Sequence, residues 1–127
     1  MNNIQYKIDN NIALRESELN EAIELKMNIE KANVSEIDDF SFLFHNEEDF
    51  NQDISSWDVS KGKKFNFMFE GAINFNQDIS SWDVSNGEDF YGMFYTATSF
   101  NQVLKKWNIK KDAITIYMFD SIEYYEV

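Results

Sequence analysis

One stretch of eleven residues, Phe50 to Ser60, returns unchanged as Phe75 to Ser85, exactly one interval of 25 residues later. A third, weaker copy begins after a further 25 residues at Phe100 and keeps Trp107 and Ile109. Chains that repeat themselves at a fixed period of about 20 to 50 residues stack similar units, each of which contacts mainly its neighbours. The sequence therefore predicts a repeat architecture.

Each unit carries two hydrophobic periodicities. In the first part, Ile54, Trp57 and Val59 have the spacing L-x-x-L-x-L, and alternation about Asp58 is typical of a short strand. In the second part, four apolar residues at i, i+3, i+4 and i+7 share one face of a short helix. They are Phe65, Met68, Phe69 and Ala72. We therefore predict an α/β fold: a leucine-rich-repeat-like solenoid of about 25-residue strand and short-helix units, with a parallel sheet on one side.

The chain is predicted to form a single domain with two parts. Residues 1–31 form an N-terminal cap, in which Ile4, Tyr6 and Ile8 alternate as in a short strand. An amphipathic helix is expected over residues 17–31, with Ser17 as its N-cap. Residues 32–127 form the repeat solenoid of about three and a half units, with a degenerate C-terminal unit. The helical cap would cover the apolar face of the first unit.

Three residue types recur at the repeat period inside the predicted structure. Phe50, Phe75 and Phe100 are expected to form an aromatic ladder. Asn51, Asn76 and Asn101 are expected to bond the backbone of neighbouring units, which would satisfy loop amides. Trp57, Trp82 and Trp107 could form a sugar-stacking platform, but their place in the hydrophobic pattern favours the core.

At these residues the sequence resembles the BspA-type leucine-rich-repeat surface protein family, a mycoplasma-lipoprotein-type domain of unknown function. Its units read approximately F-N-x-D-I-S-x-W-D-V-S-N-V-x-x-M-x-x-M-F, and the resemblance covers roughly residues 17–122. Gly62 and Gly87 replace the family's Val, and Phe65 and Phe90 replace its first helical Met. Glycine there either loosens the turn or permits a backbone angle that Val would forbid. The resemblance implies a secreted or lipid-anchored protein that adheres to host proteins or other cells.

The charge is strongly acidic and unevenly distributed. The chain has 11 Lys and Arg against 23 Asp and Glu, a net charge of −12. Charges balance from Phe100 onward, so the excess lies in residues 1–99. Such a field repels nucleic acid and anionic membranes and favours a basic partner, although it also serves solubility.

The compartment is left open by the sequence. The chain has no cysteine, so neither a disulfide framework nor a thiol nucleophile is available. No signal peptide, lipobox or membrane span is visible. We expect a cytoplasmic protein if Met1 is native, and a cell-surface or secreted one if a leader was removed.

Catalysis is not expected, and no cofactor is predicted. The single histidine, His45, lies in an acidic loop over residues 45–49, and no Gly-rich phosphate loop accompanies it. Nucleophilic catalysis needs an activated nucleophile beside a base, and no such combination stands out.

The repeated aspartates offer two chemical alternatives. The pairs Asp53 with Asp58 and Asp78 with Asp83 could act as general acid and base, or could hold calcium between units. The third unit has Val103 and Asn108 at these places, which disfavours a metal. We therefore expect Asp53 and Asp78 to cap turns, and Asp58 and Asp83 to occupy exposed strand positions.

The outward positions of the predicted strands form a candidate partner-binding surface, because the sheet face of a solenoid often binds proteins. Three rows of residues make up this surface: Ser56, Ser81 and Lys106; Asp58, Asp83 and Asn108; Ser60, Ser85 and Lys110. The rows change from acidic and hydroxyl-rich to basic along the array, which suggests a protein partner.

We thus predict a non-catalytic repeat module for protein–protein binding, similar to surface adhesin-type proteins. The alternative is a cytoplasmic acidic inhibitor, of the immunity or antitoxin kind, that binds a basic partner protein. Neither nucleic acid binding nor membrane insertion is expected. Homo-oligomerisation through the C-terminal edge is a further possibility, because the last predicted strand, near residues 107–109, leaves an open edge that residues 124–127 look too short to cover.

Overall fold

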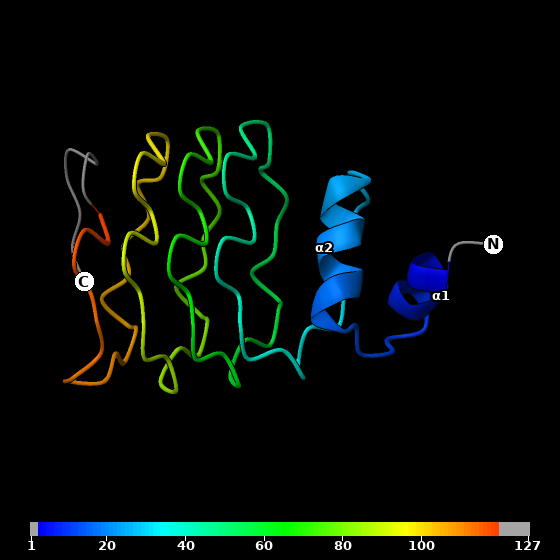
Figure 1. The fold of residues 1–127 in the computed structure, drawn as a ribbon, viewed down its shortest axis with the longest axis horizontal. Helices are drawn as coiled ribbons and strands as arrows, with labels where there is room; N and C mark the ends of the chain where they lie inside the picture. Colours follow the sequence, from blue (N-terminus) through cyan, green and yellow to red (C-terminus); the bar gives the residue numbers. More distant parts are fainter. Residues whose placement is uncertain (1–2, 120–127) are drawn as a thin grey trace.

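The structure is a computed structural model that describes residues 3–119. Helices α1 (Asn3–Asp9) and α2 (Glu16–Glu24) come first and are followed by successive coils of turns and irregular backbone. Figure 1 shows the two helices at one end of a row of coils that lie side by side. Isolated parallel bridges join equivalent residues of neighbouring coils, at Asp39–Lys64, Lys64–Asp89 and Asp89–Ile114. The coils therefore follow one another in the register of the sequence repeat.

The predicted α/β leucine-rich-repeat solenoid with a parallel sheet is wrong. Between residues 3 and 119 the two short helices are the only regular elements, and no β-strand is present. Each coil instead consists of a half that carries the Asp and Ser residues, such as residues 50–62, and a half of consecutive turns, such as residues 63–74. We call these the polar half and the turn half.

Two closely spaced turns prevent a strand in the polar half. The amide of Trp57 donates to the carbonyl of Ile54 at 3.1 Å, and the amide of Gly62 donates to that of Val59 at 2.8 Å. Only Asp58 lies between these turns, so no extended run remains to form a ladder. Trp57 and Val59 still point inward and are buried, as the alternation predicts.

Positive φ angles prevent a helix in the turn half. Phe67 has φ +56° and Gly71 has φ +71°, outside the right-handed helical region. Alternate amides donate to carbonyls of the next coil at 2.8–3.0 Å, from Phe65, Phe67, Phe69 and Gly71. A helix of two turns is only marginally stable by itself, whereas these bonds join each coil to its neighbour. Four side chains that were expected on one helix face are nevertheless buried: Phe65, Met68, Phe69 and Ala72.

The N-terminal segment forms a helix, so the predicted strand there is wrong. Ile4 and Ile8 are buried on one face of α1, whereas Tyr6 between them is exposed. The three residues fit a period of two, but Ile4 and Ile8 also have the i, i+4 spacing of a helix. So short a pattern does not separate the two elements.

Helix α2 is shorter than predicted because the backbone reverses at Lys26, which has φ +56°. The amide of Lys26 donates to the carbonyl of Ile23, and that of Met27 donates to Ala22, each at 3.0 Å. This pair of bonds is the Schellman arrangement that ends many helices. The predicted helix over residues 17–31 therefore stops at Glu24.

The N-cap of α2 is Arg15, so Ser17 is not the cap. The buried carboxylate of Glu18 accepts from the Arg15 amide at 2.9 Å and from Lys7 Nζ at 2.7 Å. The first of these bonds satisfies an otherwise orphaned amide at the helix start. The second fixes α1 against α2.

The predicted phenylalanine ladder and the predicted burial of the tryptophans are confirmed. Ring centroids are 5.8 Å apart between Phe50 and Phe75 and 5.9 Å apart between Phe75 and Phe100. The tryptophans stack at 6.4–6.5 Å, and all three are buried in the core: Trp57, Trp82 and Trp107. Each indole Nε1 also donates to a carbonyl of the preceding coil at 2.9–3.0 Å. Each ladder thus runs through the coils that contain the repeat.

The predicted asparagine ladder is also confirmed. The amide of Asn76 donates to Asn51 Oδ1 at 2.9 Å, and the amide of Asn101 donates to Asn76 Oδ1 at 3.0 Å. Backbone amides that no strand pairs are therefore satisfied by side chains of the preceding coil.

The two departures from the family pattern are physically linked. A Cβ on Gly62 would lie 2.4 Å from Phe65 Cζ, and one on Gly87 would lie 2.3 Å from Phe90 Cζ. Positive φ among the glycines is confined to Gly71 and Gly92, so an unusual backbone angle does not explain the substitution. The phenylalanine rings occupy the space in which a larger side chain would stand.

Candidate functional site

The predicted partner-binding residues lie on the outside of the polar halves. We call this surface the polar face. Seven of its nine predicted residues are exposed: Ser56, Asp58, Ser81, Asp83, Lys106, Asn108 and Lys110. Ser60 and Ser85 are half-buried. Because Trp57, Trp82 and Trp107 stack beneath them, the predicted residues form rows across three coils.

The polar face already uses much of its hydrogen-bonding capacity internally. Asp58 Oδ1 accepts from the Ser60 amide at 3.0 Å and from the Ser60 hydroxyl at 2.6 Å. Asp83 makes the same two bonds with Ser85. These are side-chain turns that hold the backbone in place of a strand. Asp58 and Asp83 are therefore exposed as expected, but they lie in turns and not on a strand.

Turn capping by the other two aspartates is confirmed. Asp53 Oδ1 accepts from the Ser55 amide at 3.1 Å, and Asp78 Oδ1 accepts from the Ser80 amide at 3.0 Å. No cluster of three or more His, Asp or Glu side chains suited to a metal ion occurs within residues 3–119. The repeated aspartates therefore act as local backbone acceptors in each coil.

The turn aspartates predict a loss of stability in acid. The Ser60 hydroxyl and then its amide hold the pKa of Asp58 below its ordinary value of 3.8, and Ser85 does the same for the pKa of Asp83. A lowered folded-state pKa contributes stability above the unfolded value, and this contribution disappears as pH falls through the folded value. In Asp58→Asn/Asp83→Asn, which keeps both Oδ1 acceptors, we expect urea midpoints to fall less between pH 5 and pH 2.5 than in the unaltered protein.

The control for this experiment is Glu24→Gln/Glu48→Gln, which removes the same charge from exposed sites outside these turns. We expect this variant to retain the steep acid dependence. An equal flattening of the profile in both variants would assign the effect to general charge repulsion and contradict the role of the turns.

A second surface, on the outside of the turn halves, was missed at the sequence level. Four aromatic rings form a continuous row with centroid separations of 5.1, 5.3 and 5.6 Å: Phe42, Phe67, Tyr91 and Tyr117. The two end residues are the most open, with Phe42 50% and Tyr117 55% exposed. We call this row and the adjoining Tyr95 the turn face. Its sequence signal is the recurrence of Phe42 and Phe67 at the repeat period, outside the pattern of buried positions.

The turn face is hollowed and has strained backbone. A depression of about 300 Å³ is lined by Phe67, Tyr91, Tyr95 and Tyr117. Phe42, Phe67 and Tyr117 have φ of +56° to +61°, whereas the equivalent position in the third coil is Gly92. Positive φ is costly for bulky side chains, at about 1–2 kcal/mol each. Such strain concentrates at functional sites.

His45 lies at the edge of the turn face. Its ring centroid is 5.7 Å from that of Phe42, and its Nε2 is 3.5 Å from Glu70 Oε1. The side chain is half-buried. This position fits a surface residue next to the aromatic row.

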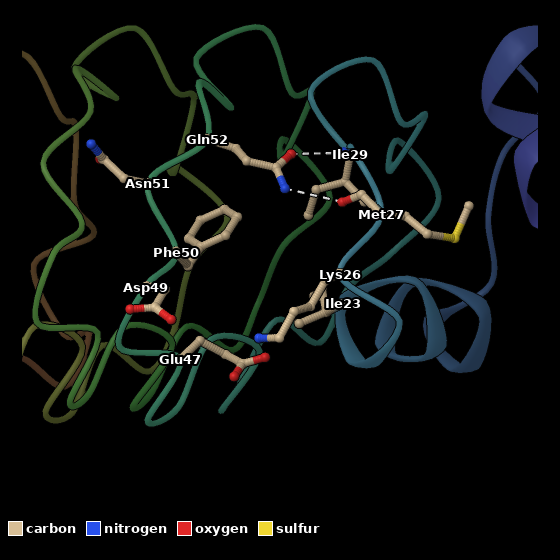
Figure 2. Close-up of a pocket in the computed structure, with 9 residues that line it drawn as sticks. All are labelled: Ile23, Lys26, Met27, Ile29, Glu47, Asp49, Phe50, Asn51 and Gln52. Carbon is tan, nitrogen blue, oxygen red and sulfur yellow. Dashed lines mark hydrogen bonds between the residues drawn. The ribbon is translucent and has the colours of Figure 1, made fainter.

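A third feature is a cavity of about 320 Å³ between the end of α2 and the first complete coil, which we call the cap groove. Figure 2 shows its lining side chains, with Phe50 on one side and Met27 and Ile29 on the other. Gln52 accepts from the Ile29 amide at 2.8 Å and donates to the Met27 carbonyl at 3.0 Å. These two bonds fix the wall that joins the cap to the first coil.

The coils and their surfaces define a class of protein: a capped stack of turn-built repeats with an acidic exterior. The chain belongs to the family described as "Mycoplasma protein of unknown function, DUF285", whose model matches residues 14–126. This is the mycoplasma BspA-like domain family, so the resemblance is supported at the level of the family. Neither a curated protein nor a solved structure matched the chain.

The two helices are short compared with a membrane span. In the part of the chain that the structure describes, no helix is long and apolar enough to cross a membrane. The last predicted strand, near residues 107–109, is not a strand in the structure. Residues 124–127, which were expected to leave its edge uncovered, lie outside the described residues, so self-association through the C-terminal edge stays a prediction.

Proposed function

We propose that this chain is a non-catalytic module that binds another protein through the turn face. The observation that carries the proposal is the row of four aromatic rings, partly exposed and in mutual contact across four coils. Aromatic residues are enriched in protein interfaces, and tyrosine and tryptophan are among the residues that dominate binding energy. An adhesin-type role would use this surface to hold a host or cell-surface protein.

The rigidity of the turn face supports this proposal. Two of its rings are attached to backbone that bonds the next coil, through the amides of Phe42 and Phe67 at 3.1 and 2.9 Å. Rings in mutual contact on a fixed backbone lose little conformational freedom when a partner binds, so more of the contact energy remains as affinity. The depression beside Tyr95 offers a place for one partner side chain.

The polar face remains the alternative binding surface predicted from the sequence. Ser56 and Ser81 donate weakly to carbonyls of the preceding coil, at 3.3 and 3.4 Å, and Lys110 lies 3.8 Å from Glu88. These hydroxyl and ammonium groups of the polar face thus already interact with neighbouring coils and are less available to a partner. This is why we place the turn face first.

A second candidate function, inhibition of a basic partner, is favoured by the net charge of −12. Charge-driven association speeds encounter and weakens steeply as salt screens it. Binding through aromatic contacts depends far less on salt. Salt dependence therefore separates this candidate from the adhesin-type role.

The test compares capture of proteins by three forms of the tagged chain, from lysate of its source and from host extracellular extract, at low and high salt. The forms are the unaltered chain, the turn-face variant Tyr91→Ala/Tyr117→Ala, and the polar-face variant Asp83→Asn/Lys106→Ala. Captured proteins are identified by mass spectrometry, and the affinity of each purified partner is then measured.

Loss of a salt-resistant interaction in the turn-face variant alone is the expected result. Truncating a dominant aromatic residue costs about 2 kcal/mol or more, so we expect affinity to fall about 30-fold or more. Loss only in the polar-face variant would move the site to the polar face. A basic partner released by salt from all three forms would favour the inhibitor instead. Thermal melts of each variant exclude unfolding as the cause.

The same proposal includes that the chain does not catalyse a reaction. Hydrolysis that disappears in Asp58→Ala or Asp83→Ala would contradict it, because those carboxylates are assigned to turns.

A further inference from the structure

The segment that follows α2 takes the place of the polar half of an additional coil. The indole of Trp82 donates to the carbonyl of Ile54, and that of Trp107 donates to Ile79. Trp57 makes the same bond to Ile29, at 2.9 Å. Ile29 therefore occupies the place that Ile54 and Ile79 hold in the complete coils, 25 residues before Ile54.

The phenylalanine ladder lacks a ring in this additional half-coil. The residue 25 positions before Phe50 is Leu25, which is 60% exposed and so does not occupy the ladder position. Phe75 and Phe100 are buried, whereas Phe50 at the end of the ladder is only half-buried. The cap groove lies at this end of the ladder, since Phe50 lines it. The ladder is thus open at the groove.

The remaining groove walls suit an aromatic ring. Ile23, Met27 and Ile29 are the apolar lining residues besides Phe50. In Figure 2 the side chains of Ile23 and Ile29 lie nearer to Phe50, whereas that of Met27 points away from it. Aromatic rings prefer offset parallel packing at centroid separations of about 4.5–7 Å. The internal ladder has this geometry, at 5.8 and 5.9 Å. An added ring beside Phe50 would continue it.

The groove rim favours a positive charge next to that ring. Glu47 and Asp49 are two carboxylates among the lining residues, and Lys26 is the one lining cation within the described residues. The rim is thus net negative, within a chain of net charge −12. A cation on the ligand would therefore be attracted both by the carboxylates at the rim and by the negative charge of the whole chain.

We propose that the cap groove is a binding site for an aromatic side chain flanked by basic residues, supplied by an extended peptide segment of a partner protein. The ring continues the phenylalanine ladder beyond Phe50. The flanking cation lies near Glu47 and Asp49. This site is separate from the turn face and does not depend on the function proposed for that surface.

The test is a titration of the full chain, with ¹³C-labelled methyl groups, by the peptide acetyl-Lys-Tyr-Lys-amide. We expect saturable shifts at the methyl groups of Ile23, Met27 and Ile29. Two control peptides, acetyl-Lys-Leu-Lys-amide and acetyl-Glu-Tyr-Glu-amide, lack the ring and the positive charge respectively, and each should bind at least fivefold more weakly. Equal shifts with all three peptides, or no saturable shift at these methyl groups, would overturn the proposal.

Two variants separate the groove from other surfaces. Glu47→Gln/Asp49→Asn should weaken binding of the Lys-Tyr-Lys peptide about fivefold without removing the apolar walls. Tyr91→Ala/Tyr117→Ala should leave it unchanged. Peptide binding that is lost only in the second variant would assign it to the turn face and contradict the groove. A result that overturns the groove proposal therefore leaves the turn-face proposal intact. A result that overturns the turn-face proposal likewise leaves the groove proposal intact.

Discussion

Replacing Trp82 with Ala is expected to lower the free energy of unfolding by about 3–5 kcal/mol. The Trp82 ring lies between those of Trp57 and Trp107, at 6.5 and 6.4 Å, and its indole donates to Ile54 at 3.0 Å. Truncation would leave a cavity in the ladder and a buried carbonyl without its donor. The measurement is urea unfolding followed by circular dichroism.

The matched control is Trp82→Phe, which keeps a ring in the ladder but removes the indole donor. We expect it to cost about 1–3 kcal/mol, chiefly for the unpaired carbonyl. A loss below about 1 kcal/mol in Trp82→Ala would contradict a buried ladder. Truncating a tightly packed tryptophan leaves a cavity, and so small a loss would mean that no such cavity forms.

The second large effect is expected from Gly71→Ala, with a loss of about 2–4 kcal/mol. Gly71 has φ +71°, and a Cβ there would lie 2.2 Å from Asn46 Oδ1. Backbone strain and overlap with the preceding coil therefore act together. Thermal and urea unfolding measure the combined cost.

Two further variants divide this cost. Asn46→Gly/Gly71→Ala removes the overlapping side chain, so the added cost of the alanine should fall to that of the backbone angle alone. Thr96→Ala, at the equivalent position with φ +58°, already bears a side chain and should change stability little. A cost for Gly71→Ala that is equally small would show that neither overlap nor strain is present.

The sequence predicted which side chains repeat inside the protein, because a fixed period brings equivalent residues of successive coils together. The Phe50 and Asn51 ladders and the burial of Trp57 follow from this principle and needed no knowledge of the backbone. Burial of Phe65 and Phe69 followed similarly, since their spacing reports which positions point inward.

The backbone itself was not predictable from that spacing. A pattern of i, i+3, i+4 and i+7 gives the direction of side chains, but it does not say whether an amide bonds its own segment or the next coil. Nothing in the sequence indicates that Phe67 has a positive φ. Bulky residues seldom adopt such an angle, so it is not expected at a phenylalanine. The Asp58 carboxylate was likewise expected on a strand, although its side-chain bond to Ser60 replaces the strand.

The candidate sites were predictable only in part. The polar face was identified from outward positions of the repeat, and seven of its nine residues are exposed. The turn face required the positions of Phe67 and Tyr91 in space, since these residues are not equivalent in the repeat. The cap groove depended on the outward position of Leu25, which the predicted continuous helix concealed.

The most direct test of the turn-built coil is backbone NMR of the labelled chain. Residues 65–72 should lack helical ¹³C shifts, Phe67 should show a positive φ, and its amide should lie close to the backbone of Tyr91, to which it donates at 2.9 Å. Helical shifts should be confined, within residues 3–119, to α1 and α2. Continuous helical shifts over residues 65–72 would contradict the structure and the arrangement of the turn face that depends on it.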